Sequence, residues 1–303
     1  MIIPTFNYGH YIVNAIESVL NQGESAESLQ IIVVDDGSTD DTLERLADYI
    51  KENKIIYAPI SNSGKAYATM LGIQFATGDI IFTLDADDYF LPGKIAKTLE
   101  VYKKLPAVVH VASPALMLHE SGMKPPMPES IPADLLGRPI PGQQLMLRFL
   151  RQKMLFGGGS TFSARADVLK KIYLPDAIDM YTDEWLVMSA LHAGDSFFLG
   201  EALSVWRIHK NNFSLAAHSN QEDGRQLRLQ NSSVAVLDAI KVAGMPAQWR
   251  HLYYLKHQVR NMVWKEMKGT KSFSDRWNFL IKICRGYHFT ELWNYRAFYR
   301  LIK

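Results

Sequence analysis

The sequence has 303 residues, of which 48% are hydrophobic and 21% are charged, and this profile indicates a globular protein of one large domain or two closely joined ones. Its single cysteine, Cys284, excludes an internal disulfide and a cysteine-rich metal site, and it favours a reducing compartment. Since neither a leader peptide nor a long uncharged apolar run is present, we expect a cytoplasmic protein that is soluble or peripheral on the membrane face.

Charge is distributed unevenly, although the formal net charge is only +2. Residues 1–224 contain 18 Lys and Arg against 27 Asp and Glu, which gives a net charge of −9. Residues 225–303 contain 15 against 4, which gives +11. This asymmetry predicts two regions with different roles.

Strand and helix patterns alternate through the first third of the chain. Residues 1–4 form an apolar run typical of a strand, and residues 11–22 place apolar side chains on one helical face. The run 31–34 is β-branched without polar alternation, as expected for a parallel strand covered on both faces. Helices are also predicted at 43–50 and 64–76, and strands at 55–58 and 80–84. The alternation predicts a doubly wound parallel sheet.

The pattern changes after Pro106. The proline-rich residues 125–141 are predicted to form a loop, and residues 183–193 a helix. The basic, aromatic-rich C-terminal region is predicted to be helical at 226–242, 247–268 and 273–284.

Acidic side chains follow the predicted strands. Ligands bind at the carboxyl ends of strands in such sheets, and Asp35, Asp36, Asp85 and Asp87 fall at those ends. Asp85 and Asp87 share one face of an extended chain, and their hard oxygens suit Mg²⁺ or Mn²⁺ with a diphosphate as the second ligand. The alternative interpretation is a solvated acidic turn.

Candidate binding residues also lie near predicted helix starts. Asp36 could accept hydrogen bonds from a base or ribose, or it could cap the helix that follows. Gly64 allows close backbone approach and Lys65 could face phosphate, although an ordinary capped helix N-terminus is the preferred explanation of Lys65. The spacing around Lys65 does not match a P-loop.

Later in the chain, three side chains could carry chemistry. Asp183 and Glu184 open a predicted helix, where either carboxylate could act as a general base or simply complement the helix dipole. His209 could ligate a metal, although most lone histidines do not.

Six motifs between Ile3 and His209 resemble, as an ordered set, the family 2 inverting glycosyltransferases of GT-A fold. They are Ile3-Pro4-Thr5-Phe6-Asn7-Tyr8, Val34-Asp35-Asp36-Gly37-Ser38-Thr39-Asp40, Asn62-x-Gly64, Asp85-Ala86-Asp87-Asp88, Thr182-Asp183-Glu184 and Trp206-Arg207-x-His209. The resemblance implies an α/β fold with a mostly parallel central sheet flanked by helices and followed by a helical C-terminal extension.

The resemblance also implies site roles. The nucleotide-sugar donor is expected to contact Pro4, Thr5, Asn7, Asp36, Asn62, Gly64, Lys65, Asp85 and Ala86. Asp87 is expected to ligate Mg²⁺ or Mn²⁺, with His209 as a further metal or diphosphate ligand. Asp183 matches the catalytic base of the family, and Glu184 is the alternative.

The expected function is inverting transfer of a sugar from a nucleotide-diphosphate sugar to an acceptor hydroxyl on a glycan or lipid-linked acceptor, in polysaccharide, cell-surface glycan or glycolipid synthesis. Residues 1–106 are predicted to form the donor-binding half, 107–224 the acceptor-binding and catalytic half, and 225–303 a basic helical region. One alternative is a catalytically inactive nucleotide-sugar-binding assembly partner, which the short first strand favours. A nucleotidyltransferase is ranked last.

The C-terminal region has two interpretations of equal weight. Aromatic residues interleaved with Arg and Lys could contact a membrane, or they could belong to a helical bundle packed on the catalytic region. These aromatics are Trp249, Tyr253, Tyr254, Trp264, Trp277 and Trp293. Nucleic acid is not expected as a partner, because no recognition motif accompanies the charge.

Overall fold

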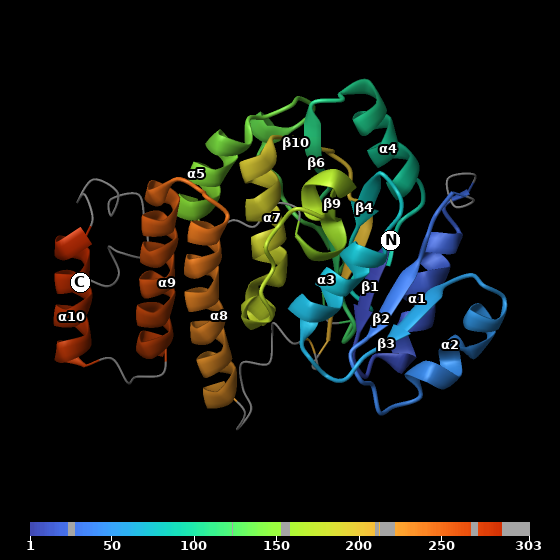
Figure 1. Cartoon of the computed structure of the whole chain (residues 1–303), viewed down its shortest axis with the longest axis horizontal. Coiled ribbons are helices and arrows are strands. Elements are labelled where there is room, and N and C mark those ends of the chain that lie inside the picture. Colours follow the sequence, from blue (N-terminus) through green and yellow to red (C-terminus); the bar gives the residue numbers. More distant parts are fainter. Residues whose placement is uncertain are drawn as a thin grey trace.

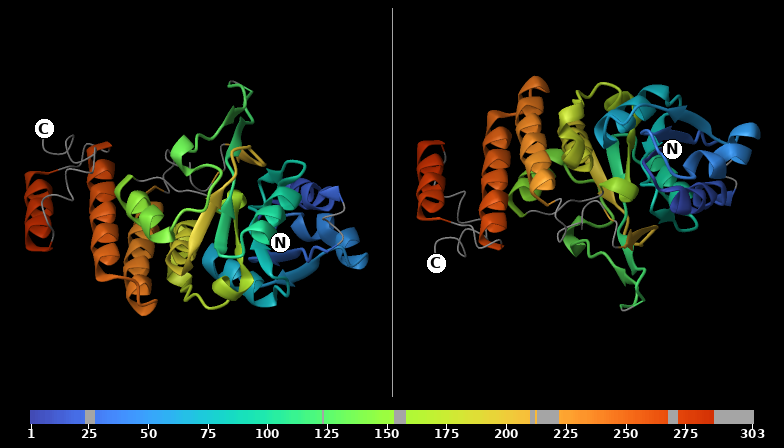
Figure 2. Two further views of the ribbon diagram at one scale, coloured as in Figure 1. Left: turned by 90° about the horizontal axis from the view of Figure 1, so that it is seen from above. Right: turned by 90° about the horizontal axis from the view of Figure 1, so that it is seen from below.

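The computed structural model describes residues 1–23, 28–122, 124–152, 158–209, 212, 222–267 and 272–286. These residues form a body of sheets and helices, beside which stand α8 (Glu222–Val242), α9 (Ala247–Met267) and α10 (Phe273–Gly286) (Figure 1). Views from above and below place α10 at one end of the molecule and the N-terminal strands toward the other (Figure 2). The α/β fold with a helical C-terminal extension is therefore confirmed.

The N-terminal elements alternate as predicted. Parallel strands pair in the order β1 (Ile2–Thr5), β2 (Ile32–Asp35) and β3 (Ile56–Pro59). The helices that follow them are α1 (Gly9–Leu20), α2 (Thr42–Lys51) and α3 (Lys65–Phe75). Every residue of β2 is buried, because helices cover both faces of this strand and its β-branched side chains pack against them.

A second sheet continues the first. Its order is β10 (Asp195–Phe198), β6 (Val108–Ala112), β9 (Phe162–Arg165) and β4 (Ile80–Phe82). A parallel bridge between Ile2 and Thr83 joins the end of β4 to β1. β10 runs parallel to β6, whereas β9 is antiparallel to both of its neighbours. The central sheet is therefore mostly parallel, as the sequence predicted.

A third sheet lies beside the central one. Its order is β5 (Tyr89–Phe90), β11 (Ser204–Ile208), β7 (Ala115–His119) and β8 (Met127–Pro128). The segment 125–141, predicted to be a loop, contains β8 and a short 3-10 helix, η2 (Ala133–Leu135). Pro128 is tolerated because β8 is an edge strand, where a missing N–H costs no inner hydrogen bond.

The other helical elements connect these strands. They are α4 (Lys94–Lys104), α5 (Gly142–Gln152), η3 (Gly159–Thr161), α6 (Ala166–Leu169), η4 (Asp176–Tyr181) and α7 (Thr182–Ala193). Two of them, η4 and α7, carry the predicted base and its neighbours, so their packing decides where the site forms.

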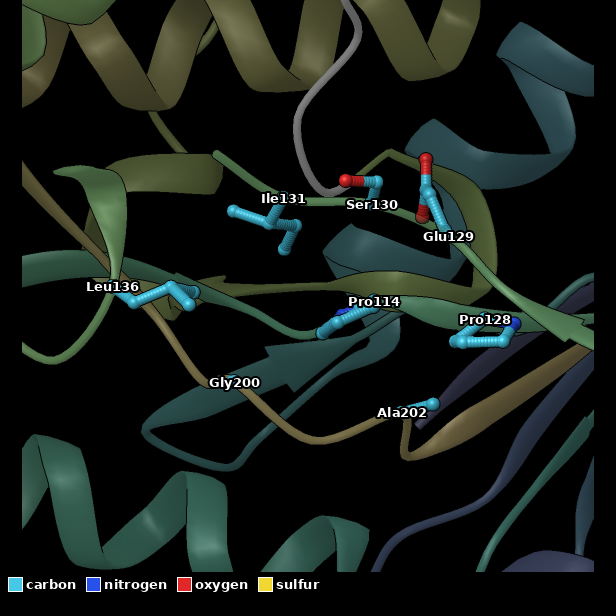
Figure 3. A pocket seen from close by; sticks show the side chains of 8 residues that line it. All are labelled: Pro114, Pro128, Glu129, Ser130, Ile131, Leu136, Gly200 and Ala202. Atoms are coloured by element: carbon cyan, nitrogen blue, oxygen red, sulfur yellow. The ribbon is translucent and has the colours of Figure 1, made fainter. Parts of the chain in front are cut away.

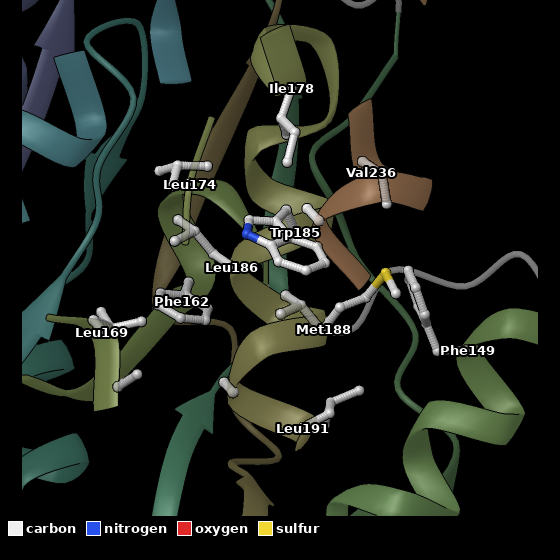
Figure 4. Packing of buried hydrophobic residues seen from close by; sticks show 14 of the residues in the cluster. Phe149, Phe162, Leu169, Leu174, Ile178, Trp185, Leu186, Met188, Leu191 and Val236 are labelled. Carbon is white, nitrogen blue, oxygen red and sulfur yellow. The ribbon is translucent and has the colours of Figure 1, made fainter. Parts of the chain in front are cut away.

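A hydrophobic cluster surrounds α7 (Figure 4). Trp185 and Met188 of α7 lie in this cluster with Phe149 of α5 and Val236 of α8. The indole Nε1–H of Trp185 donates a 2.8 Å hydrogen bond to the carbonyl of Tyr173, so its buried polar group is satisfied. Because strand residues such as Ile2 belong to the same cluster, one core runs from the sheet to α8 and α9.

The aromatic residues of the C-terminal region divide into two groups. Trp249 and Tyr253 are 2% and 0% exposed and belong to the cluster around α7, as the bundle interpretation predicts. Trp277 on α10 is 58% exposed. Trp293 and the side chain of Trp264 lie outside the described residues.

No helix within the described ranges is long and apolar enough to cross a bilayer. The region boundaries expected after residues 106 and 224 stay a prediction.

Candidate active site

Asp36, directly after β2, holds the loop that leads into α3. One carboxylate oxygen accepts the backbone N–H of Ser63 at 2.6 Å, and the other accepts that of Gly64 at 2.9 Å. Burial raises the pKa of Asp36, although these two hydrogen bonds oppose the shift. The structure therefore uses Asp36 to order the start of α3, and not to cap α2 as one interpretation of the sequence expected.

Asn7 links the loops after β1 and β2. Its backbone N–H donates to the hydroxyl of Ser38 at 2.9 Å, and its Oδ1 accepts the N–H of Thr39 at 2.8 Å. Asn7 has a φ of 57°, a left-handed conformation that Asn tolerates better than most residues. Its side-chain oxygen thus shapes the rim of the expected nucleoside pocket.

The remaining nucleoside candidates lie around the same loops. Pro4 pairs with Val34 within the parallel ladder. Thr5 is 3% exposed, and its hydroxyl has no hydrogen-bond partner in the described part of the chain. Asn62 is exposed, and its backbone N would lie 3.0 Å from a Cβ placed on Gly37, whose φ is +81°. A glycine is therefore needed where these loops approach each other.

Lys65, the first residue of α3, contacts both Asp85 and the predicted base, Asp183. Its ammonium nitrogen lies 2.7 Å from Oδ1 of Asp85 and 3.0 Å from Oδ2 of Asp183. Burial would lower the pKa of Lys65, but the charges of Asp183 and Asp85 outweigh it and raise that pKa above its ordinary value. Lys65 therefore keeps its positive charge between two carboxylates.

The carboxylates of Asp85, Asp87 and Asp88 each offer an oxygen, and these oxygens lie within 4.8 Å of one another. Burial raises the pKa of Asp85 to about 6, and it raises that of Asp88 well above the usual range. Ala86, between the first two, is buried. Three crowded carboxylates need positive charge nearby, so the cluster suits a divalent cation with oxygen ligands.

His209, expected as a further metal or diphosphate ligand, contacts Asp87. Its Nε2 lies 3.1 Å from Oδ2 of Asp87, and the side-chain amide of Asn212 donates to the same oxygen at 3.2 Å. The ring of Tyr11 packs against the imidazole, with centroids 4.9 Å apart. An imidazole beside the acidic cluster adds a nitrogen atom that can ligate a metal ion.

The two candidate bases point to different surroundings. Asp183 contacts Lys65, which places its carboxylate beside Asp85. Glu184 instead forms ion pairs with Lys256, at 3.1 Å, and Arg260, at 2.7 Å, on α9. The structure therefore brings Asp183, and not Glu184, to the sheet edge that carries the acidic cluster.

Four residues that shape this site had no role predicted from the sequence: Gly159, Ser160, Asp179 and Asn212. A Cβ on Gly159, whose φ is +53°, would lie 3.2 Å from an Asp85 oxygen. Ser160 donates its hydroxyl to Asp88 at 2.5 Å and accepts the N–H of Asp85 at 3.0 Å. In the sequence, only the run of glycines before Ser160 marks this loop as unusual. No sequence pattern singled out Asp179 or Asn212.

A separate cleft of about 290 Å³ lies between the β7–β8 hairpin and the segment before β11 (Figure 3). Pro114, Pro128 and Ala202 line it together with Glu129. Burial raises the pKa of the Glu129 carboxyl, which accepts the N–H of Ala115 at 3.2 Å. None of the predicted site residues lines this cleft.

Residues 1–173 match the model of the glycosyl transferase family 2. The chain belongs to this family. The match includes the Asp36 loop, Lys65 and the acidic cluster, and it ends before α7. The GT-A type of α/β fold expected from the family motifs is therefore confirmed, and the Asp183 segment lies outside the matched residues.

Relatives include an uncharacterised glycosyltransferase of Nostoc, 27% identical over 74% of this chain and 70% of that protein. An uncharacterised glycosyltransferase of Mycoplasma pneumoniae is 42% identical over 30% of this chain and 31% of its own length. The chondroitin synthase of Escherichia coli is 34% identical over 34% of this chain and 15% of that protein. The chain thus spans most of one relative and small parts of the others.

Among solved structures, the fold resembles that of TarS from S. aureus. The structure of TarS residues 1–349 with UDP-GlcNAc has a TM-score of 0.58 and 20% identity, covering 78% of this chain and 65% of that one. The same fragment without a named ligand has a TM-score of 0.57 and 18% identity, covering 90% and 91%. At these identities the likeness establishes the fold alone.

Proposed function

We propose that the chain transfers a sugar from a nucleotide-diphosphate sugar to an acceptor hydroxyl, with inversion at the anomeric carbon. The observation that carries the proposal is the meeting of Lys65, Asp85 and Asp183 at one sheet edge. Lys65 and Asp183, from distant parts of the sequence, thus lie beside the acidic cluster to which Asp85 belongs. TarS was solved with UDP-GlcNAc, so a UDP-linked sugar is the first donor to test.

The nucleoside is proposed to lie over the ends of β1 and β2. The buried hydroxyl of Thr5 lacks a partner within the described residues, and it offers the nucleoside a hydrogen bond there. Asp36 fixes the loop through Ser63 and Gly64, so its main contribution is to the shape of the pocket. Pro4, Asn7, Asn62 and Ala86 complete the walls.

Asp85, Asp87 and His209 are the residues that would hold a divalent cation, for which Mg²⁺ or Mn²⁺ best fits a set rich in carboxylate oxygens. When bound, such an ion supplies positive charge that offsets the charge of a diphosphate leaving group. Lys65 adds a fixed positive charge at the same edge, facing Asp85.

Asp183 is the proposed base. Its carboxylate accepts the proton of the acceptor hydroxyl while the hydroxyl oxygen bonds to the anomeric carbon. The bond between that carbon and the diphosphate oxygen breaks in the same displacement, and the electron pair leaves with the nucleoside diphosphate. Glu184 is bound to Lys256 and Arg260, so Asp183 is preferred for this role.

The acceptor is proposed to be a glycan or a lipid-linked sugar, with synthesis of a polysaccharide, surface glycan or glycolipid as the process. Peripheral contact with a membrane is proposed for α10, because Phe273 and Trp277 are 82% and 58% exposed and residues 225–303 carry a net charge of +11. The cytoplasmic location stays a prediction.

The function is tested by incubating the purified protein with a panel of nucleotide-sugars, with Mn²⁺ or with a chelator, and measuring the nucleoside diphosphate released. We expect metal-dependent release from one class of donor, and loss of that release in Asp87→Asn. Tight binding of a nucleoside diphosphate without release from any donor, even with glycan acceptors present, would support the alternative of an inactive assembly partner.

A further inference from the structure

The ion pairs of Glu184 tie the first turn of α7 to α9. The Glu184 carboxylate is 8% exposed and lies 3.1 Å from the ammonium of Lys256, which is itself 1% exposed. It also accepts a 2.7 Å hydrogen bond from the guanidinium of Arg260. Burial would raise the pKa of Glu184, but the charges of Lys256 and Arg260 outweigh this and lower it to about 2.

The cations of this group also pack on aromatic rings that flank α7. The Lys256 ammonium lies 3.6 Å from the ring centre of Phe149 on α5. The Arg260 guanidinium lies 4.9 Å from the ring centre of Tyr181, the residue directly before α7. Arg260 therefore holds both sides of the turn on which Asp183 sits, through Tyr181 before it and Glu184 after it.

A second link joins the C-terminal helices to the same segment. Arg228 of α8 forms an ion pair with Asp179 of η4. The other oxygen of Asp179 accepts the backbone N–H of Lys65 at 2.7 Å. The segment that carries Asp183 is thus fastened to α8 through Asp179 and to α9 through Glu184.

We infer that Lys256 and Arg260, acting through Glu184, are positioning residues for Asp183, and that α9 is part of the scaffold of the active site. The inference rests on the proposed function, because it concerns the base of the proposed reaction. Its physical basis is that a base must be held within a fraction of an ångström of its working position. A displacement of this turn would separate the Glu184 carboxylate from its two cations, and separating buried opposite charges is costly.

The test uses Arg260→Gln, with Arg260→Lys as the conservative variant and Arg250→Gln as the control. Arg250 also lies on α9, but it contacts α8 through the carbonyl of Leu237 and not α7. With UDP-GlcNAc and Mn²⁺, kcat for UDP release is expected to fall at least tenfold in Arg260→Gln, while KM for the donor stays within twofold. Arg260→Lys is expected to recover most of the loss, and Arg250→Gln to leave both constants unchanged.

A second measurement does not require turnover. Amide hydrogen exchange in the first turn of α7, residues 182–186, is expected to be at least tenfold faster in Arg260→Gln than in wild type or Arg250→Gln. Unchanged exchange there, or an equal loss of kcat in Arg250→Gln, would overturn the inference. If Asp183→Asn kept its activity, the proposed base would be wrong, while the exchange experiment would still decide whether α9 orders this turn.

Discussion

The ammonium nitrogen of Lys65 lies 3.0 Å from Oδ2 of Asp183, although 118 residues separate them in the sequence. This contact fixes the distance between the loop after β3 and the start of α7. Because Lys65 also contacts Asp85, the pairing brings the proposed base to the acidic cluster.

Asp183→Asn is expected to lower kcat by about 10²- to 10⁴-fold, because an amide cannot accept the proton of the acceptor. Binding of UDP with Mn²⁺, measured by calorimetry, is expected to stay within a few fold of wild type. Asp176→Asn is the matched control, since Asp176 is an exposed residue of η4. Near-normal turnover in Asp183→Asn would remove Asp183 from the reaction.

Thr5→Val is expected to weaken UDP binding without lowering the free energy of unfolding. Valine has nearly the shape of threonine, and the Thr5 hydroxyl lacks a partner within the described residues, so the free energy of unfolding should stay the same or rise by about 1 kcal/mol. Loss of a hydrogen bond to the nucleoside should weaken UDP binding by about five- to tenfold. Urea unfolding and calorimetry measure the two effects. Unchanged UDP affinity would place the nucleoside elsewhere.

Gly64→Ala is expected to disturb the donor loop. Gly64 has a φ of +92°, and a Cβ there would lie 2.7 Å from an Asp179 oxygen. Gly137 has a φ of +72° with nothing within 4 Å, so Gly137→Ala carries the backbone strain of about 1 kcal/mol without the clash. We expect Gly64→Ala to lose more stability than this control and to bind UDP less well. Equal effects in both variants would exclude a tight contact at Gly64.

Glu184 is expected to contribute to acid sensitivity. Its pKa falls from 4.5 to about 2 in the folded protein, so the unfolded chain takes up the proton first as the pH drops. The stabilisation is therefore present above about pH 4.5 and is lost as the pH falls toward 2.

Two variants test this acid sensitivity. Glu184→Gln should lower the free energy of unfolding at neutral pH by roughly 3 to 5 kcal/mol, because it removes the buried carboxylate that balances the charges of Lys256 and Arg260. The variant should also show a shallower decline of stability between pH 4.5 and 2. Exposed Glu44→Gln is the control. Urea unfolding across this range measures both, and identical slopes would contradict the assignment.

The exposed aromatic residues of α10 provide a test of membrane contact. Replacement of both Phe273 and Trp277 by serine should weaken binding to vesicles of anionic phospholipid at least tenfold, because it removes the apolar groups that can enter the interface. Val242→Ser on α8, where valine is 64% exposed, should bind vesicles like wild type. Sedimentation with vesicles measures this, and equal binding by all three proteins would contradict the proposed contact.

Sequence patterns located the acidic side chains best where they follow strands. Asp36, Asp85 and Asp87 come after strands that unbroken apolar runs mark clearly, and parallel strands share one edge. The structure also brings His209 into contact with Asp87, a contact that the sequence did not specify. Their roles toward a donor stay predictions.

Contacts between helices that are far apart in the sequence could not be predicted from sequence patterns. Nothing in the spacing of Asp183 and Glu184 indicates that one faces Lys65 and the other Lys256, because the direction depends on how α7 is rotated in the core. Asp179 gave no signal for a similar reason, since its partners lie 114 residues before it and 49 after it. A sequence pattern that spans a few neighbouring residues cannot indicate contacts across such long sequence separations.

The place of β9 in the central sheet bears on how the chain is synthesised. β9 lies between β4 and β6, and both strands precede it in the sequence, so until residues 162–165 leave the ribosome each has an edge with unsatisfied backbone groups. A nascent chain that pauses after β6 and before β9, between residues 112 and 162, would expose both strand edges and be prone to aggregate.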